Sequence, residues 1–201
     1  MHMKLIIIAG MPASGKTYLS KRIQVEFPYL IIEKDAIKER LFDTIGFQNY
    51  AGKRQLDVAA NAVLFEILEQ LYQSNTDAII VNNFISTDAA KLDKFLEQKR
   101  IHCVTVFLNG DPQVFYERYY ERDKNGERHL GHAMQLRYPP DPMQPEIFDM
   151  TREGFDERFL KLGMDKIGWR GNVVYLDATY PWKIDVNALI RQIAEGLGSG
   201  D

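Results

Sequence analysis

Five short hydrophobic runs alternate along the chain with longer segments of mixed polarity. The runs are rich in isoleucine, leucine and valine, which is typical of strands buried on both faces of a parallel sheet. They predict strands at residues 4–9, 29–33, 77–82, 102–108 and 172–177. The intervening segments predict helices at about 16–26, 35–43, 53–73, 87–100, 111–123 and 185–197. This order predicts an α/β fold, with helices on both faces of a mainly parallel five-stranded sheet.

Hydrophobic spacing within the longest predicted helix indicates which of its residues are buried. In the segment 53–73, apolar residues recur three or four positions apart, as on the core face of a helix. The expected core residues are Leu56, Ala60, Val63, Ile67 and Leu71.

Two segments do not follow the alternation of strands and helices. The segment 43–53 carries glycine and aromatic residues, and the segment 122–146 is charged, then histidine-bearing, then proline-rich. Loops of this length in a compact domain are usually disordered or functional. In open α/β sheets ligands bind beyond the carboxyl ends of the strands, where both segments are expected to emerge.

The first predicted strand ends at a glycine-containing loop. Gly10 is followed by four residues and then by Gly15, Lys16 and Thr17, which is the phosphate-binding pattern G-x-x-x-x-G-K-[ST]. Glycines allow backbone N–H groups to curl around an oxyanion, and the following helix directs its positive N-terminus to the same point. The pattern predicts that a nucleoside triphosphate binds to Gly10, Pro12, Ala13, Ser14, Gly15, Lys16 and Thr17.

Length and composition narrow the class of protein. At 201 residues, of which 45% are hydrophobic, the chain can form one well-buried core, so we expect a single domain over residues 1–201. The net charge of −3 disfavours a broad nucleic-acid surface but leaves room for a local basic groove. The one cysteine, Cys103, excludes an internal disulfide. No hydrophobic run approaches the ~20 residues that span a bilayer, and we expect a cytoplasmic protein without a membrane partner.

Asp35 directly follows the second predicted strand. At that point a carboxylate could accept the proton of an attacking hydroxyl group in a phosphotransfer reaction. Aspartate is also a preferred N-cap residue, so Asp35 could cap the helix that follows. The two roles are compatible, because a cap at this point also faces the mouth of the sheet.

The stretches GMPASGKTYLSKRI and PYLIIEKDAIKERLF resemble the small P-loop kinases that phosphorylate hydroxyl groups. This superfamily includes 5′-hydroxyl polynucleotide kinases, chloramphenicol phosphotransferases, and gluconate and shikimate kinases. The resemblance implies a three-layer P-loop sandwich with a lid, and the use of ATP and Mg²⁺. In that superfamily an aspartate at the position of Asp35 acts as the base or orients the acceptor hydroxyl. Thr17 and Asp35 are therefore the expected ligands of Mg²⁺.

Two positions depart from the pattern of that superfamily. The polynucleotide kinases usually have an arginine three residues after the aspartate, whereas this chain has Lys38, which cannot make a bidentate contact. The third strand of such kinases commonly ends in a Walker B carboxylate, whereas this chain has Asn82 and Asn83. An asparagine can hydrogen-bond a metal-bound water without adding charge. Alternatively, the two asparagines form a polar turn at the end of the strand.

The segment DPQVFYERYYERDKNGERHLGH resembles the arginine-bearing lid of the same superfamily. Arg118 and Arg122 are four residues apart on a predicted helix and share a face, and Arg128 follows in the next segment. Lid arginines close onto the γ-phosphate and spread its developing charge. The resemblance therefore implies catalytic roles for Arg122 and Arg128, and nucleotide contacts for Arg118 and Arg122. The alternative is a solvated helix end, because Glu and Arg alternate here.

His129 and His132 lie in the lid segment three residues apart. No cysteine or acidic residue at ligand spacing accompanies them, which disfavours a structural zinc site. They are interpreted as contacts to the substrate or lid, or as surface residues. Residues 179–181 follow the last strand, where the superfamily places the loop beside the adenine ring.

The segment 133–168 lies outside the resemblance. We expect it, together with the lid, to form a helical cap over the acceptor pocket at about 122–168, or else to pack against the sheet. Its aromatic residues include Tyr138, Phe148, Phe155 and Phe159.

The function expected from these features is ATP-dependent transfer of the γ-phosphate to a hydroxyl group of a small molecule. Lys16, Asp35, Arg122 and Arg128 are the expected catalytic residues. One alternative acceptor is a nucleoside, a nucleotide or the 5′-hydroxyl of a polynucleotide. A second alternative is a non-catalytic ATP-binding switch, which the missing Walker B carboxylate would suit. GTP is disfavoured because the chain lacks an N-K-x-D-type motif. The sequence leaves the acceptor and the oligomeric state open.

Overall fold

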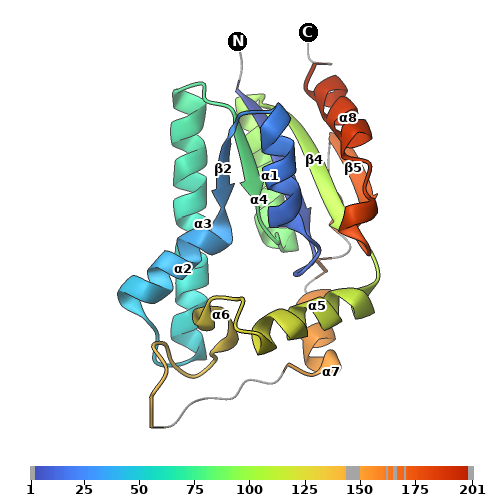
Figure 1. The fold of residues 1–201 in the computed structure, drawn as a ribbon. Helices are drawn as coiled ribbons and strands as arrows, with labels where there is room; N and C mark the ends of the chain where they lie inside the picture. Colours follow the sequence, from blue (N-terminus) through green and yellow to red (C-terminus); the bar gives the residue numbers. More distant parts are fainter. Residues whose placement is uncertain (1–2, 144–149, 162, 165–166, 170, 199–201) are drawn as a thin grey trace.

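The computed structural model describes residues 3–143, 150–161, 163–164, 167–169 and 171–198. A five-stranded sheet lies at its centre in the order β2-β3-β1-β4-β5, and every pair of neighbouring strands is parallel (Figure 1). The strands are β1 (Lys4–Gly10), β2 (Leu30–Glu33), β3 (Ala78–Val81), β4 (His102–Asn109) and β5 (Asn172–Asp177). The expected α/β fold with a five-stranded parallel sheet is confirmed.

Helices cover both faces of this sheet and extend beyond one of its ends (Figure 1). They are α1 (Lys16–Glu26), α2 (Lys34–Ile45), α3 (Tyr50–Gln73), α4 (Ser86–Lys99), α5 (Pro112–Lys124), α6 (Leu130–Ala133), α7 (Arg152–Phe155) and α8 (Val186–Gly198). A π-helical turn at Asp156–Leu160 continues α7. The sequence predicted the six longer helices, but it did not predict α6 or α7, which are one turn long and carry no hydrophobic periodicity.

Alternate residues of the central strand β1 enter two separate cores. Ile6 and Ile8 pack with α1 and α8 on one face of the sheet, and Leu5 and Ile7 pack with α3 and α4 on the other. All four side chains are fully buried. Burial of one such side chain is worth roughly 1.5–3 kcal/mol, so a strand covered on both faces needs hydrophobic residues at successive positions.

The buried face of α3 differs from the expected one. Val63 is 40% exposed and Ile67 is half-buried, whereas Leu64 and Leu68 lie in the core. We expected the buried face to continue from Ala60 to Val63, three residues later. In the structure it continues to Leu64, four residues later, which lies about 100° farther around the helix axis than Val63. The prediction for Val63 was therefore wrong, although α3 itself was predicted.

The parallel arrangement brings the carboxyl ends of all five strands to the end of the molecule where α2, α5 and α6 lie (Figure 1). There the two irregular segments meet, because Phe47 and Tyr138 exchange a pair of backbone hydrogen bonds of 2.9 and 2.8 Å. A small apolar cluster of Phe42, Phe47, Leu56 and Met134 packs beneath this junction. Among the described residues, no helix is both long enough and apolar enough to span a membrane.

Candidate active site

The loop between β1 and α1 has the backbone conformation that its glycines suggest. Gly10 and Gly15 have φ values of 141° and 90°, and Ala13 between them also has a positive φ of 60°. A Cβ atom on Gly10 would lie 2.2 Å from the carbonyl oxygen of Leu108, so only glycine fits there. The loop is thus closely packed against β4, and its backbone turns at the N-terminus of α1.

Lys16 lies in the first turn of α1 and folds back over this loop. Its Nζ atom donates hydrogen bonds to the carbonyl oxygens of Gly10 and Met11, at 3.2 and 2.7 Å. Burial lowers the pKa of Lys16 to about 8, although the nearby Asp35 carboxylate acts in the opposite direction. The ammonium group is therefore desolvated and held by neutral oxygens, a state in which an anionic ligand stabilises its charge.

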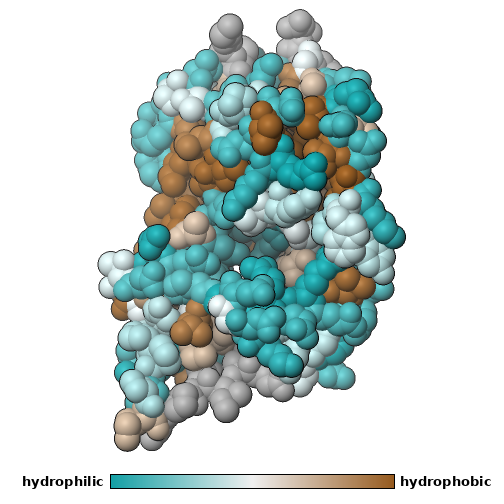
Figure 2. All heavy atoms as spheres, viewed as in Figure 1, coloured by the Kyte–Doolittle hydropathy of each residue, from teal (hydrophilic) through white to brown (hydrophobic). Residues whose placement is uncertain are grey.

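A cavity of about 420 Å³ opens beside Lys16 at the carboxyl ends of β1, β2 and β3. The predicted site residues that line it are Pro12, Ala13, Gly15, Lys16, Thr17, Asp35, Arg122 and Arg128. Gly10, Ser14 and Arg118 do not line it. Gly10 contributes its carbonyl oxygen to Lys16 instead, and Ser14 is fully buried beneath the loop. Figure 2 shows that hydrophilic residues predominate on this face over α2 and α5.

Asp35 lies in the first turn of α2 and is exposed to the cavity. It does not cap the helix, because α2 begins at Lys34 and Glu33 occupies the N-cap position. The expectation of a capping role is therefore wrong. Desolvation raises the pKa of Asp35, but the basic side chains around it, with His132 the strongest, outweigh that effect and lower the pKa below its ordinary value. Asp35 is thus an ionised carboxylate near neutral pH.

The end of β3 presents amides to the same cavity. The Nδ2 atom of Asn82 and the Oδ1 atom of Asn83 are buried and have no hydrogen-bond partner among the described residues. Unpaired buried polar atoms are uncommon, and at the wall of a cavity they can bind a ligand or an ordered water. This favours the view that the asparagines contribute to the site over the view that they form only a turn.

Glu33 supplies a carboxylate that the sequence reasoning missed. It is the last residue of β2 and lines the cavity with Thr17 and Asp35. Its position immediately after a buried hydrophobic run was the available signal. Oxygen atoms from a hydroxyl and carboxylates are the ligands that Mg²⁺ prefers, so these three side chains fit that ion. Among the described residues, no three His, Cys, Asp or Glu side chains form a preassembled metal cluster.

The arginines of the expected lid lie in two different places. Arg122 lines the cavity, and so does Arg128, whose Nη1 atom lies 3.2 Å from Asp123 and whose guanidinium stacks 4.4 Å from the ring centroid of Tyr119. Arg118 instead donates hydrogen bonds to the carbonyl oxygens of Ala178 and Thr179. The structure therefore separates Arg118, which braces the loop after β5, from the two arginines that face the P-loop.

The loop braced by Arg118 closes against the P-loop. The guanidinium of Arg118 also lies 5.6 Å from the ring centroid of Trp182. A Cβ atom on Gly15 would lie 3.3 Å from Pro181, so the two loops are nearly in contact. This is where the resemblance placed an adenine-binding loop at residues 179–181.

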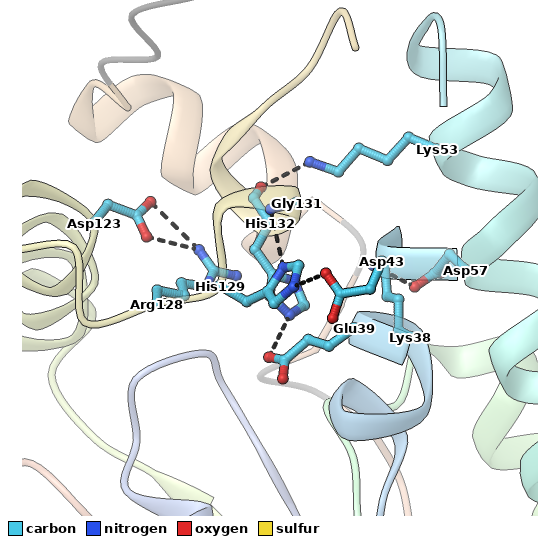
Figure 3. Close-up of polar contacts among 10 residues, drawn as sticks. All are labelled: Lys38, Glu39, Asp43, Lys53, Asp57, Asp123, Arg128, His129, Gly131 and His132. Carbon is cyan, nitrogen blue, oxygen red and sulfur yellow. Dashed lines mark hydrogen bonds and ion pairs between the residues drawn. The ribbon is translucent and has the colours of Figure 1, made fainter. Parts of the chain in front are cut away.

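The two histidines fasten the lid segment to α2 (Figure 3). The Nε2 atom of His129 lies 2.9 Å from Asp43, and that of His132 lies 3.1 Å from Glu39. Asp43 also accepts a hydrogen bond from the hydroxyl of Tyr138 at 2.9 Å. The histidines thus pair with carboxylates of α2, and His132 additionally lines the cavity.

A second, smaller cavity of about 160 Å³ adjoins the first. The two share Asp35, Asn83, Arg128 and His132. The other residues that line the second cavity are Lys34, Lys38, Tyr50, Lys53, Arg54, Asp57, Ile85, Asp88, Arg158, Phe159 and Met164. Lys38, the departure from the polynucleotide kinase pattern, is paired here with Asp57 of α3 at 2.6 Å.

The segment expected to form a cap has some side chains in the core and others beside the smaller cavity. Phe155 is fully buried against Tyr119 of α5, with ring centroids 5.5 Å apart. Phe159 packs against the same ring and also lines the smaller cavity, as does the neighbouring Arg158. Phe148 lies outside the described residues. The described part of the segment therefore packs in the core and also borders the smaller cavity, and a cap over an acceptor stays a prediction.

The parallel sheet and the glycine-containing loop between β1 and α1 define an α/β fold of the P-loop type. The chain belongs to the AAA domain family, whose model matches residues 5–138. UPF0200 proteins of Saccharolobus islandicus and Saccharolobus solfataricus are 23% identical to it over 172 residues, spanning 82% of this chain and 79% of theirs.

Solved structures with kinase-like folds superpose on nearly the whole chain. A kinase candidate from Chloroflexus aurantiacus has a TM-score of 0.78 at 23% identity and covers 98% of this chain and 99% of its own. A gluconokinase from Sinorhizobium meliloti has a TM-score of 0.54 at 17% identity, with 98% and 92% covered. A tunicamycin resistance protein from Deinococcus radiodurans has a TM-score of 0.55 at 15% identity, with 98% and 96% covered. At these identities the likeness establishes the fold.

Proposed function

We propose that this protein transfers the γ-phosphoryl group of ATP to a hydroxyl group of a small molecule. The proposal depends chiefly on the position of Asp35, which lines the cavity of Lys16 and Thr17 and also the adjoining smaller cavity. A carboxylate at such a junction can contact an acceptor hydroxyl in one cavity while nucleotide phosphates occupy the other.

The P-loop and the lid arginines act on the nucleotide. Backbone N–H groups of the loop and the N-terminus of α1 bind the phosphates. Lys16 exchanges the carbonyl oxygens of Gly10 and Met11 for phosphate oxygens, which stabilise its charged form more strongly. Arg122 and Arg128 stabilise the charge that develops on the transferred group.

Asp35 acts on the acceptor. The acceptor oxygen forms a bond to the γ-phosphorus as the bond to the β–γ bridging oxygen breaks, and the hydroxyl proton passes to the Asp35 carboxylate. The basic surroundings that lower the pKa of Asp35 keep it ionised and ready to orient the hydroxyl. When bound, Mg²⁺ neutralises phosphate charge, and Thr17, Glu33 and Asp35 offer it oxygen ligands.

Replacement of Asp35 tests this function. A panel of sugars, polyols and nucleosides, screened for acceptor-dependent ATP consumption, first provides an acceptor. With it, Asp35→Asn is expected to lower kcat by about 10²–10⁴ while the Kd for a non-hydrolysable ATP analogue changes by less than about threefold. Glu26→Gln, at the exposed end of α1, is the matched control and should leave both values unchanged. Equal losses of turnover and nucleotide binding in Asp35→Asn would contradict the proposal.

A non-catalytic ATP-binding switch is the second candidate. The observation that favours it is the pair Asn82 and Asn83 at the end of β3, where such kinases carry a carboxylate. Glu33 in the same cavity weakens this candidate, because it supplies an acidic oxygen from the neighbouring strand. Under the switch hypothesis ATP binds, but no hydroxyl compound of the panel increases its consumption.

A further inference from the structure

We infer that the smaller cavity binds the acceptor through an anionic group, a carboxylate or a phosphate, which Arg54 and Arg158 hold. This inference rests on the proposed function and deepens it, because it assigns the acceptor to the class of hydroxyl compounds that also carry an acidic group. The position of the cavity, its charges and two guanidinium groups without an acidic partner on its wall support the inference in turn.

The position of the cavity suits an acceptor. It meets the nucleotide cavity at Asp35, Asn83 and Arg128, and from there it extends toward α3. A molecule that places a hydroxyl group at Asp35 therefore directs its remaining atoms toward the wall formed by α3 and the π-helical turn. At about 160 Å³ the cavity has room for a small molecule but is well below the size of the nucleotide cavity.

Two lysines at the base of the cavity share a single carboxylate. The Nζ atoms of Lys34 and Lys38 lie 2.9 and 2.6 Å from the same Oδ1 atom of Asp57. The nearby Asp35 carboxylate also acts on both lysines. The lining as a whole nevertheless holds six Lys and Arg side chains against three carboxylates, so the cavity keeps an excess of basic groups. Asp57 stays ionised, since the two lysines outweigh the effect of its burial and lower its pKa. Asp57 is therefore paired with the two lysines of α2, and it forms no ion pair with Arg54 on its own helix.

The two arginines on the wall have no acidic partner among the described residues. Arg54, on α3, forms no hydrogen bond or ion pair with any residue that the structure describes. Arg158 stacks 5.5 Å from the ring centroid of Phe159, and its Nη1 atom lies 3.2 Å from the Gln135 side-chain oxygen in the amide orientation that satisfies both groups. An amide oxygen leaves the charge of a guanidinium uncompensated. Guanidinium groups bind carboxylates and phosphates through paired hydrogen bonds.

Asp88 is the third carboxylate that lines the cavity, and it already has a hydrogen-bond partner. Asp88 accepts a hydrogen bond from the side chain of Asn61 at 3.1 Å, and burial raises its pKa above the ordinary value. The cavity thus has an excess of basic side chains, among them two guanidinium groups without an acidic partner. Its carboxylates Asp57 and Asp88 already have partners. A neutral acceptor would leave these guanidinium groups without an acidic partner, whereas an acidic acceptor pairs with them through charge-assisted hydrogen bonds.

The experiment measures anion binding with the nucleotide cavity filled. The wild-type protein is saturated with Mg²⁺ and AMP-PNP, so that added anions do not compete for the P-loop. Inorganic phosphate is then titrated while the melting temperature is recorded. Saturable stabilisation of the wild type is expected, and Arg54→Gln/Arg158→Gln is expected to raise the midpoint at least tenfold. Arg191→Gln, an exposed arginine on α8, is the matched control and should behave as the wild type.

Paired small molecules distinguish the kind of anion. Gluconate is compared with glucitol, and glycerol 3-phosphate with glycerol, under the same conditions and with the same variants. The acidic member of a pair is expected to stabilise the wild type more than the neutral member, and the double variant is expected to lose that difference. If the wild type ignores phosphate and both acids, or if the double variant responds as the wild type does, the inference fails.

The two proposals fail in different ways. The affinity for AMP-PNP, measured without any anion, tests the nucleotide site and should be the same in the double variant and the wild type. Unchanged AMP-PNP affinity without anion binding overturns only the anionic acceptor. Absence of AMP-PNP binding in the wild type overturns the proposed function itself.

Discussion

Lys16 shows how burial of a charged group in the P-loop prepares it to bind an anion. Its ammonium group is buried against the carbonyl oxygens of Gly10 and Met11, and burial lowers its pKa to about 8. Bound phosphate oxygens favour the charged form, so they raise the pKa of Lys16 again. Binding and protonation are therefore coupled in a window above pH 8.

This coupling predicts proton uptake when the nucleotide binds. At pH 9 most Lys16 side chains of the free protein are neutral, and each must gain a proton in the complex. Affinity for ATP is thus expected to fall as the pH rises from 8 to 10. Calorimetry in buffers of different ionisation enthalpy measures the uptake. Lys16→Arg, which stays charged throughout, should bind ATP without it. Uptake of the same size in both proteins would show that Lys16 is not the group involved.

At the scale of elements, the lid segment is docked on α2 by close contacts. His129 and His132 pair with Asp43 and Glu39 (Figure 3). Gly131 between them packs directly on the ring of Phe42. A Cβ atom at Gly131 would lie 2.3 Å from that ring. The short helix α6 therefore depends on a glycine for its approach to α2.

Gly131→Ala is expected to loosen this contact. Overpacking of this kind costs about 1–3 kcal/mol, so the melting temperature should fall and residues 129–138 should exchange their amide hydrogens faster. Gly52→Ala, on α3, is the control, because its nearest neighbour would lie 3.5 Å from the added carbon. Thermal melting and hydrogen exchange measured on both variants check the prediction. Equal behaviour of the two would show that the lid does not rely on the contact at Phe42.

The elements that the sequence predicted are those with strong local signals. The hydrophobic runs and the loop from Gly10 to Thr17 report on neighbours in the chain, so their positions could be inferred without a structure. The docking of α6 and the lining of the smaller cavity could not. Arg54 and Asp57 resemble solvated residues on a helix surface, and only the packing of α2, α3 and the π-helical turn makes them line one cavity with Lys38 and Arg158. The buried face of α3 was predicted incorrectly because apolar residues spaced three apart and four apart both fit a helix.

At the scale of the whole molecule, the parallel sheet collects residues from distant parts of the chain at one edge (Figure 1). The P-loop, the start of α2, the end of β3 and the lid all border the cavity of about 420 Å³. The chain carries a net charge of −3, yet basic side chains gather at this edge. Such a local excess favours anionic ligands without making the whole surface basic.

The central claim is that the loop from Gly10 to Thr17 binds the phosphates of a nucleotide while Arg122 faces them. Titration of ¹⁵N-labelled protein with Mg²⁺ and AMP-PNP, followed by NMR, tests it most directly. The backbone amides of Gly15, Lys16 and Thr17 and the side-chain signal of Arg122 are expected to shift together and to saturate at one midpoint. Unchanged amide signals in this loop at saturating nucleotide, or shifts confined to another part of the molecule, would contradict the claim.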